Sequence, residues 1–163
     1  MKEIKNVSII GMGALGVMYG SHLAHHMGFD HVTYIMDEKR YEKYKGSTVT
    51  CNGEELSFPC VPASQAVPAD LVIVAVKSTG LTEALDTMKN CIGPDTVILS
   101  VMNGISSEEI IGERYGAEHI IYAVAQGMDA MKFGAELTYS KMGVLCIGAR
   151  LESQQDGLDR VCC

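Results

Sequence analysis

The chain lacks the features that mark several large classes of protein. Its net charge is −7 at pH 7, and no stretch gathers the lysines and arginines that a nucleic-acid surface needs. The N-terminal apolar run is far too short for a signal peptide, and no later run approaches the length of a membrane-spanning helix. We therefore expect a cytoplasmic protein that binds neither nucleic acid nor membrane.

The sequence also lacks a metal-binding pattern. None of the six cysteines belongs to a C-x-x-C pair, and the neighbouring Cys162 and Cys163 do not have a ligand spacing. Without a secretory signal, we expect reduced thiols. His22 and His26 lie one helical turn apart, but no glutamate separates them in the metalloprotease pattern and no third ligand is evident. We predict no metal site, and no Ser/His/Asp or Cys/His catalytic constellation follows from the spacings.

What the chain does contain is an alternation of strand-like and helix-like segments. Hydrophobic residues make up 47% and charged residues 20%, which is an ordinary globular composition. The strand-like apolar runs cover residues 6–10, 31–36, 69–77, 96–101 and 119–126. The helical patterns cover residues 14–27, 37–45, 81–92 and 106–116. This alternation predicts a Rossmann-type, doubly wound α/β fold with a mostly parallel sheet.

Two further patterns refine this prediction. Asn52-Gly53 stands between two strand-like runs and is a hairpin turn signal. Residues 135–148 look like two strands that meet near Met142-Gly143. From residue 149 a helical pattern begins that lacks a cap and a polar end. We therefore expect a dinucleotide-binding domain over residues 1–150, with residues 151–163 starting a helix that leads to an absent C-terminal domain.

The first loop carries a glycine pattern, Gly-x-Gly-x-x-Gly, formed by Gly11, Gly13 and Gly16. Alone, such a triplet is equally consistent with a flexible loop. Here a strand precedes it and a helix follows it, which is the setting that a pyrophosphate-binding turn requires. The first glycine permits the tight turn, the second lets a pyrophosphate approach, and the third lets the helix pack closely. The predicted cofactor-binding residues of this turn are Gly11, Met12, Gly13, Ala14, Leu15 and Gly16.

The end of the second predicted strand bears on the ribose of the cofactor. Asp37 occupies the place of the acidic residue that usually binds the ribose 2′-hydroxyl of NAD. Arg40 follows closely and could pair with the 2′-phosphate of NADP. The alternative is that Asp37 merely begins a helix, where acidic residues are favoured. We include both residues in the predicted cofactor site.

Two polar residues follow other apolar strands. Lys77 closes the run "LVIVAVK", and Asn103 follows "VILSVM". Ligands of doubly wound folds bind at the carboxyl ends of the strands, so the lysine could reach the cofactor and the asparagine a substrate carbonyl or the nicotinamide ribose. Alternatively, Lys77 is a solvated strand end and Asn103-Gly104 an ordinary turn.

These motifs together resemble the ketopantoate reductase (2-dehydropantoate 2-reductase) family. The resemblance rests on "GMGALG", "VAVKS", "MNG" and the hairpin "VTCNGEELSF", and it covers about the first half of a family member. It implies an NADPH-dependent Rossmann domain followed by a helical domain, and reduction of 2-dehydropantoate to pantoate for coenzyme A synthesis. By resemblance, the glycine turn holds the pyrophosphate, Lys77 contacts the cofactor and Asn103 touches both cofactor and substrate.

The resemblance has one departure and several alternatives. Many members carry a basic residue where this chain has Asp37, so NADP(H) is expected by resemblance and NAD(H) stays open. The general-acid lysine of the family lies in the helical domain, so we expect this chain to bind cofactor without turnover. The expected partners are a small 2-keto acid and, in a homodimer, a second copy. Alternatives are another 2-keto acid dehydrogenase or a stand-alone nucleotide-sensing Rossmann module.

Overall fold

A seven-stranded sheet forms the centre of the computed structural model, which describes residues 1–104 and 106–163. Its order is β11-β8-β7-β6-β1-β2-β5, and only β11 runs antiparallel to its neighbour. Without β11, this is the strand order of a dinucleotide-binding fold, which confirms the predicted fold class. The strands are β1 (Val7–Ile10), β2 (Val32–Met36), β5 (Cys60–Pro62), β6 (Leu71–Val74), β7 (Val97–Ser100), β8 (Ile120–Gln126) and β11 (Val144–Gly148).

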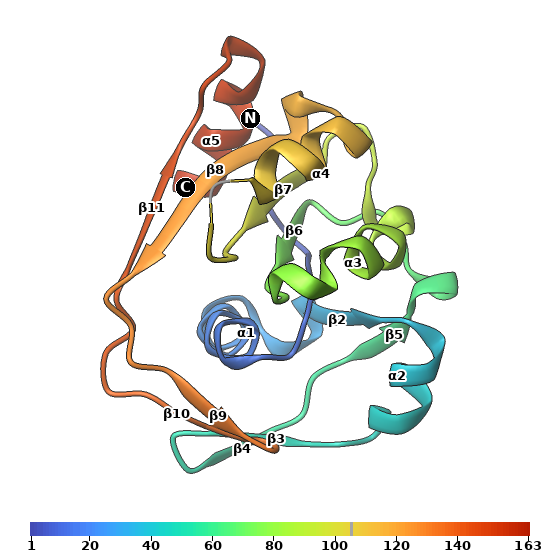
Figure 1. Cartoon of the computed structure of the whole chain (residues 1–163), viewed down its shortest axis with the longest axis vertical. Helices are drawn as coiled ribbons and strands as arrows, with labels where there is room; N and C mark the ends of the chain where they lie inside the picture. The colour runs from blue at the N-terminus through green and yellow to red at the C-terminus, as the bar shows by residue number, and fades with distance from the viewer. Residues whose placement is uncertain (105) are drawn as a thin grey trace.

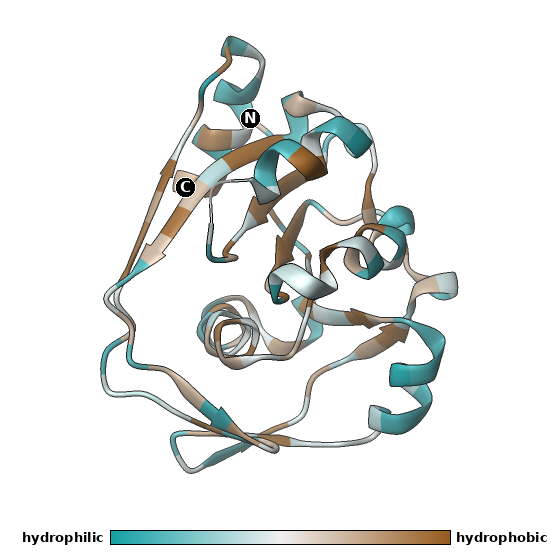
Figure 2. Ribbon diagram, viewed as in Figure 1, coloured by the Kyte–Doolittle hydropathy of each residue, from teal (hydrophilic) through white to brown (hydrophobic). Residues whose placement is uncertain are grey.

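Helices cover both faces of this sheet (Figure 1). Helices α3 and α4 pack on one face, and α1 packs on the other. The central strands are mostly apolar, with one serine each in β1 and β7, as expected for strands covered on both sides, whereas α2 is largely hydrophilic (Figure 2). The helices are α1 (Ala14–Met27), α2 (Glu38–Tyr44), α3 (Leu81–Thr87), α4 (Ser107–Tyr115) and α5 (Gln155–Cys162). Single 3-10 turns span Phe29–His31, Ala63–Gln65, Ser78–Gly80, Lys89–Cys91, Ala117–His119 and Glu152–Gln154.

A second sheet of four short strands encloses α1 from the other side (Figure 1). Its order is β4-β3-β10-β9, and the turn between β3 and β4 has positive φ at Asn52 and Gly53, as the hairpin signal predicts. The sequence did not predict this sheet. The two strands expected within residues 135–148 exist but belong to different sheets. The strands are β3 (Val49–Cys51), β4 (Glu54–Leu56), β9 (Met131–Phe133) and β10 (Glu136–Thr138).

Helix α1 packs directly against strand β2, with glycines at the contact. The hydroxyl of the fully buried Tyr34 donates a hydrogen bond to the carbonyl oxygen of Gly16 at 2.7 Å. A Cβ atom on Gly20 would lie 1.9 Å from the Tyr34 hydroxyl oxygen, so a larger residue cannot occupy that position without displacing the ring. Burial raises the pKa of the Tyr34 phenol. The hydroxyl therefore stays protonated and available as a donor.

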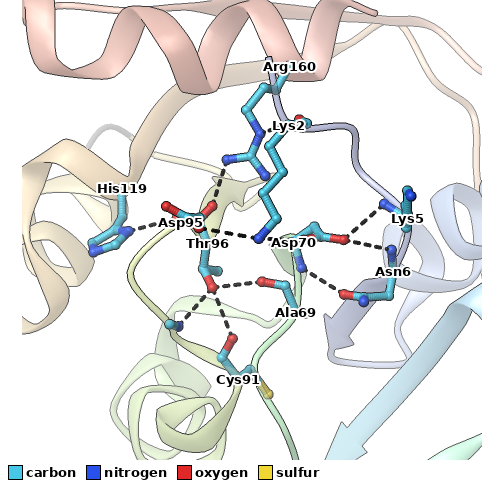
Figure 3. A network of polar contacts seen from close by, with 11 residues as sticks. Lys2, Lys5, Asn6, Ala69, Asp70, Cys91, Asp95, Thr96, His119 and Arg160 are labelled. Carbon is cyan, nitrogen blue, oxygen red and sulfur yellow. Dashed lines mark hydrogen bonds and ion pairs between the residues drawn. The ribbon is translucent and has the colours of Figure 1, made fainter.

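At the amino ends of the strands, the carboxylate of Asp70 ties the N-terminal segment to β6 (Figure 3). One oxygen accepts the backbone N–H groups of Lys5 and Asn6 at 3.0 and 3.2 Å, and the other lies 3.3 Å from the Lys2 ammonium. Burial by itself raises the pKa of Asp70, but these hydrogen bonds and the Lys2 charge outweigh it, and the net pKa is lowered. The same ammonium also pairs with the exposed Asp95 at 3.3 Å.

The segment after residue 150 packs against the same amino ends. The guanidinium of the buried Arg160 donates to the carbonyl oxygens of Lys2 and Asp95 at 2.8 and 2.6 Å (Figure 3). The fully buried Gln154 donates to the carbonyl oxygen of Ala117 at 2.7 Å. The expected helix is therefore present as α5, and the domain boundary at residue 150 stays a prediction.

The two carboxylates that share Lys2 provide a matched stability test. Asp70→Ala leaves two backbone donors without an acceptor, and we expect the free energy of unfolding to fall by about 1–3 kcal/mol. Asp95→Ala removes only an exposed ion pair, and we expect a change within about 0.5 kcal/mol. Urea denaturation of both variants measures this difference. Equal losses would contradict the role assigned to Asp70.

The lowered carboxyl pKa values also predict acid sensitivity. The pKa of Asp129 is lowered to about 2, first by the Ser140 hydroxyl and then by the Lys141 N–H, and that of Asp70 is lowered as described. A lowered folded-state pKa adds stability above the ordinary pKa, and this stability is lost as pH falls through the folded value. We expect the urea midpoint to drop as pH falls from about 5 through about 4, the ordinary carboxyl pKa, to about 2, and to drop less in Asp70→Asn. An equal drop in the variant would contradict this.

Candidate functional site

Three adjacent parallel strands, β1, β6 and β7, bring their carboxyl ends to one edge of the sheet. Backbone hydrogen bonds continue past the strand ends, from Ala75 N–H to the Ile10 carbonyl at 2.8 Å and from Val101 N–H to the Val74 carbonyl at 3.0 Å. The chain leaves β1 toward β2 on one side and later returns as β6 on the other. This reversal creates the crevice in which open α/β sheets bind ligands.

The glycine turn between β1 and α1 divides into packed and open positions. Gly11 has φ +106°, and a Cβ atom there would lie 2.4 Å from the Ala75 carbonyl oxygen. A Cβ atom on Gly16 would lie 2.1 Å from the Gly11 carbonyl oxygen. Gly13 has no heavy atom within 4 Å of its would-be Cβ. The first and third glycines are therefore required by packing, whereas the second borders open space.

The electrostatics at the start of α1 suit an anion. The helix has 14 residues and begins at Ala14, directly after the turn, and its first turn contains no acidic residue. The unpaired N–H groups and the dipole of such a helix start favour negative charge.

A cavity of about 510 Å³ joins the glycine turn to the end of β2. Its lining includes Gly11 and Met12 from the turn, and Asp37 and Arg40 from the start of α2. Val76 lines it from the segment after β6. Four of the residues predicted to hold a cofactor, although separated in sequence, thus border a single space.

Asp37 begins α2, as the alternative interpretation predicts, and its role in binding a ribose stays a prediction. Its carboxylate caps α2 by accepting the Arg40 N–H at 2.9 Å, and the same side chain lines the cavity. The Arg40 guanidinium lies 3.5 Å from the second oxygen of Asp37 and 3.5 Å from the carboxylate of Glu83 on α3. No sequence pattern pointed to Glu83, because it lies 43 residues from Arg40 and follows no motif.

Lys77 and Asn103 lie near this edge but do not line the cavity. The strand expected to end at Lys77 ends at Val74, because the chain leaves the ladder and enters the 3-10 turn at Ser78–Gly80. Lys77 and Asn103 are both exposed, and Gly104 has φ +109°, as the turn interpretation of Asn103-Gly104 requires. Both residues remain candidates for contacts beyond the cavity.

A cavity of about 630 Å³ beside α1 contains none of the predicted residues. Within residues 1–104 and 106–163, no three His, Cys, Asp or Glu side chains gather as a metal site would require. Over the same residues, no helix is long and apolar enough to cross a bilayer.

Comparison with known sequences identifies the family. A family model described as "Ketopantoate reductase PanE/ApbA" matches residues 7–150. The chain belongs to the ketopantoate reductase family. This is a family of NAD(P)H-dependent oxidoreductases, so the predicted family resemblance and the oxidoreductase class are confirmed.

Individual relatives agree with this assignment. The 2-dehydropantoate 2-reductase of Streptococcus pyogenes serotype M1 is 30% identical over 125 residues, which cover 71% of this chain and 38% of the relative. The chain thus spans well under half the length of the curated relatives it matches. A putative 2-dehydropantoate 2-reductase from Enterococcus faecalis has a similar fold, with a TM-score of 0.78 at 22% identity, covering 96% of this chain and 52% of that structure.

A solved structure of a different enzyme is almost as similar in fold as the Enterococcus faecalis protein. A ternary structure of D-mandelate dehydrogenase with NADH and anilino(oxo)acetate gives a TM-score of 0.75 at 23% identity, covering 96% of this chain and 54% of that structure. At these identities the structural likeness shows the fold alone.

Gly13 and Gly16 differ in the space beside their Cα atoms, and a stability measurement detects this difference. Gly16→Ala drives a methyl group into the Gly11 carbonyl oxygen, and we expect the free energy of unfolding to fall by about 1–3 kcal/mol. Gly13→Ala meets no neighbour, and we expect a change within about 1 kcal/mol. Thermal or urea unfolding of the two variants tests this. A loss in Gly13→Ala as large as that in Gly16→Ala would contradict the packing described.

Proposed function

We propose that the chain binds NAD(P)H as the cofactor-binding part of an oxidoreductase that reduces 2-dehydropantoate to pantoate. The observation that carries the proposal is the cavity that joins the glycine turn to Asp37 and Arg40. A dinucleotide needs a place for its pyrophosphate and a place for its adenosine ribose on the same side of the first helix. The family membership supports the reaction class.

The residues of the chain offer a place for the pyrophosphate and a place for the adenosine ribose. The open space beside Gly13 would let a diphosphate reach the N–H groups at the start of α1. Asp37 lines the cavity, and its carboxylate would accept the ribose 2′-hydroxyl there. Arg40 is the one residue of the predicted site that would pair with a 2′-phosphate, so the choice between NADH and NADPH depends on its surroundings.

For the reacting end of the site we propose Lys77 and Asn103. When bound, NAD(P)H supplies the hydride that reduces the keto carbon. Lys77 would contact the cofactor, and Asn103 offers a donor and an acceptor with which to orient the substrate carbonyl. No residue of the chain matches the general acid expected by family resemblance, and we therefore expect binding of cofactor by this chain without turnover.

A second candidate is a dehydrogenase acting on a different 2-keto acid. The similarity in fold to a D-mandelate dehydrogenase solved with NADH favours it, as does an acidic residue rather than a basic one at the end of β2. The two candidate functions are separated by substrate profiling of a protein that contains this chain and has the full length of its relatives. A strong preference for 2-dehydropantoate supports the first, and a preference for another 2-keto acid supports the second.

The proposal predicts that Gly13→Ala loses cofactor affinity without losing the fold. A methyl group at Gly13 would stand where the diphosphate approaches, and we expect the Kd for NADH and NADPH to rise about tenfold or more. The matched control is Gly148→Ala, because Gly148 also has no heavy atom near its would-be Cβ and lies on β11. Fluorescence titration of reduced cofactor measures all three proteins.

Two results would count against the proposal. The first is that neither cofactor binds the unsubstituted chain at millimolar concentration. The second is that Gly13→Ala and Gly148→Ala bind equally well. Binding that is weakened only in Gly13→Ala supports the assignment of the glycine turn.

A further inference from the structure

The guanidinium of Arg40 is shared between two carboxylates that come from different elements. Asp37 lies at the start of α2 and Glu83 lies on α3, and each has an oxygen 3.5 Å from a nitrogen of Arg40. Arg40 lines the cavity, as do Gly80 and Ala84 of the segment that carries Glu83. Glu83 does not itself line the cavity, but it reaches the cavity through its contact with Arg40.

Two carboxylates compete with a further anion for Arg40. Asp37 and Glu83 each pair with the guanidinium. Lys132 also lines the cavity, and its ammonium donates to the Gly134 carbonyl oxygen at 2.6 Å while keeping its positive charge. A 2′-phosphate carries close to two negative charges at neutral pH, so it would have to compete with Glu83 for the guanidinium.

We propose that Glu83 is a specificity-determining residue that keeps Arg40 from a 2′-phosphate and so favours NADH over NADPH. The inference rests on the proposed function, because it concerns the same cofactor site. A ribose with a free 2′-hydroxyl needs only Asp37, whereas a phosphorylated ribose needs the arginine that Glu83 holds. Glu83 acts through Arg40 and is a positioning residue.

The first experiment compares Glu83→Gln with a control on the same helix. We expect Glu83→Gln to lower the Kd for NADPH about two- to fivefold and to leave the Kd for NADH unchanged, because exposed ion pairs have effects of this size. Asp86→Asn is the matched control: Asp86 is similarly exposed and pairs with Arg114 at 2.7 Å, away from the cavity. We expect it to change neither Kd.

The second experiment separates positioning from simple repulsion. In an Arg40→Gln background, Glu83→Gln should no longer improve NADPH binding, because no guanidinium remains to be released. Glu83→Asp keeps the charge and should keep the NADH preference. The gain in Glu83→Gln should also shrink at about 1 M salt, where the screening length is about 3 Å.

The outcomes distinguish this inference from the proposed function. If the unsubstituted chain binds neither NADH nor NADPH, both are overturned. If it binds cofactor but the ratio of the two Kd values is the same in Glu83→Gln and Asp86→Asn, only the role of Glu83 is overturned. If Glu83→Gln improves NADPH binding equally in the Arg40→Gln background, Glu83 does not act by holding Arg40. The improvement then comes from removing the repulsion between Glu83 and the phosphate. A shifted ratio in Glu83→Gln alone, lost without Arg40, supports the inference.

Discussion

The close approach of helix α1 to the sheet is the constraint on which the rest of the structure depends. A Cβ atom on Gly16 would lie 2.1 Å from the Gly11 carbonyl oxygen, and one on Gly20 would lie 1.9 Å from the Tyr34 hydroxyl oxygen. Because Gly16 and Gly20 have no side chains, helix α1 can pack this deeply against the sheet. That depth leaves the other side of the helix to be covered by the small sheet, while Gly11 and Met12 of the preceding turn line the cavity.

The two edges of the main sheet are built from the same residue types but differ in their pairing. At the amino edge, the carboxylate of Asp70 and two nitrogens of the Arg160 guanidinium are buried and bound to backbone groups, whereas Nη2 of Arg160 is buried without a partner among the described residues. At the carboxyl edge, Asp37, Arg40 and Glu83 are partly exposed and hold one another at 3.5 Å. Buried and well-bonded charges fix a structure, whereas loosely paired exposed charges can exchange partners with a ligand. This difference suits a fold whose amino edge is rigid and whose carboxyl edge binds a ligand.

Local patterns were sufficient to predict the framework but not its long-range pairings. The apolar runs predicted five strands of the main sheet, and the spacing of apolar residues predicted α1 over the residues that form it. Strands β5 and β9 have three residues each, too few to show a pattern, and β10 pairs with β3 from a distant part of the chain. The same limit applies to the site. The glycine turn and Asp37 follow known spacings, whereas Glu83 meets Arg40 only through the packing of α3.

The bond between Arg160 and the Lys2 carbonyl has a practical consequence for how the protein can be handled. It brings residues 2 and 160 together at the amino edge, and both marked ends of the chain lie beside α5 (Figure 1). The glycine turn and its cavity open at the carboxyl edge of the same strands. A fluorophore or surface tether at either end would therefore sit away from the cavity.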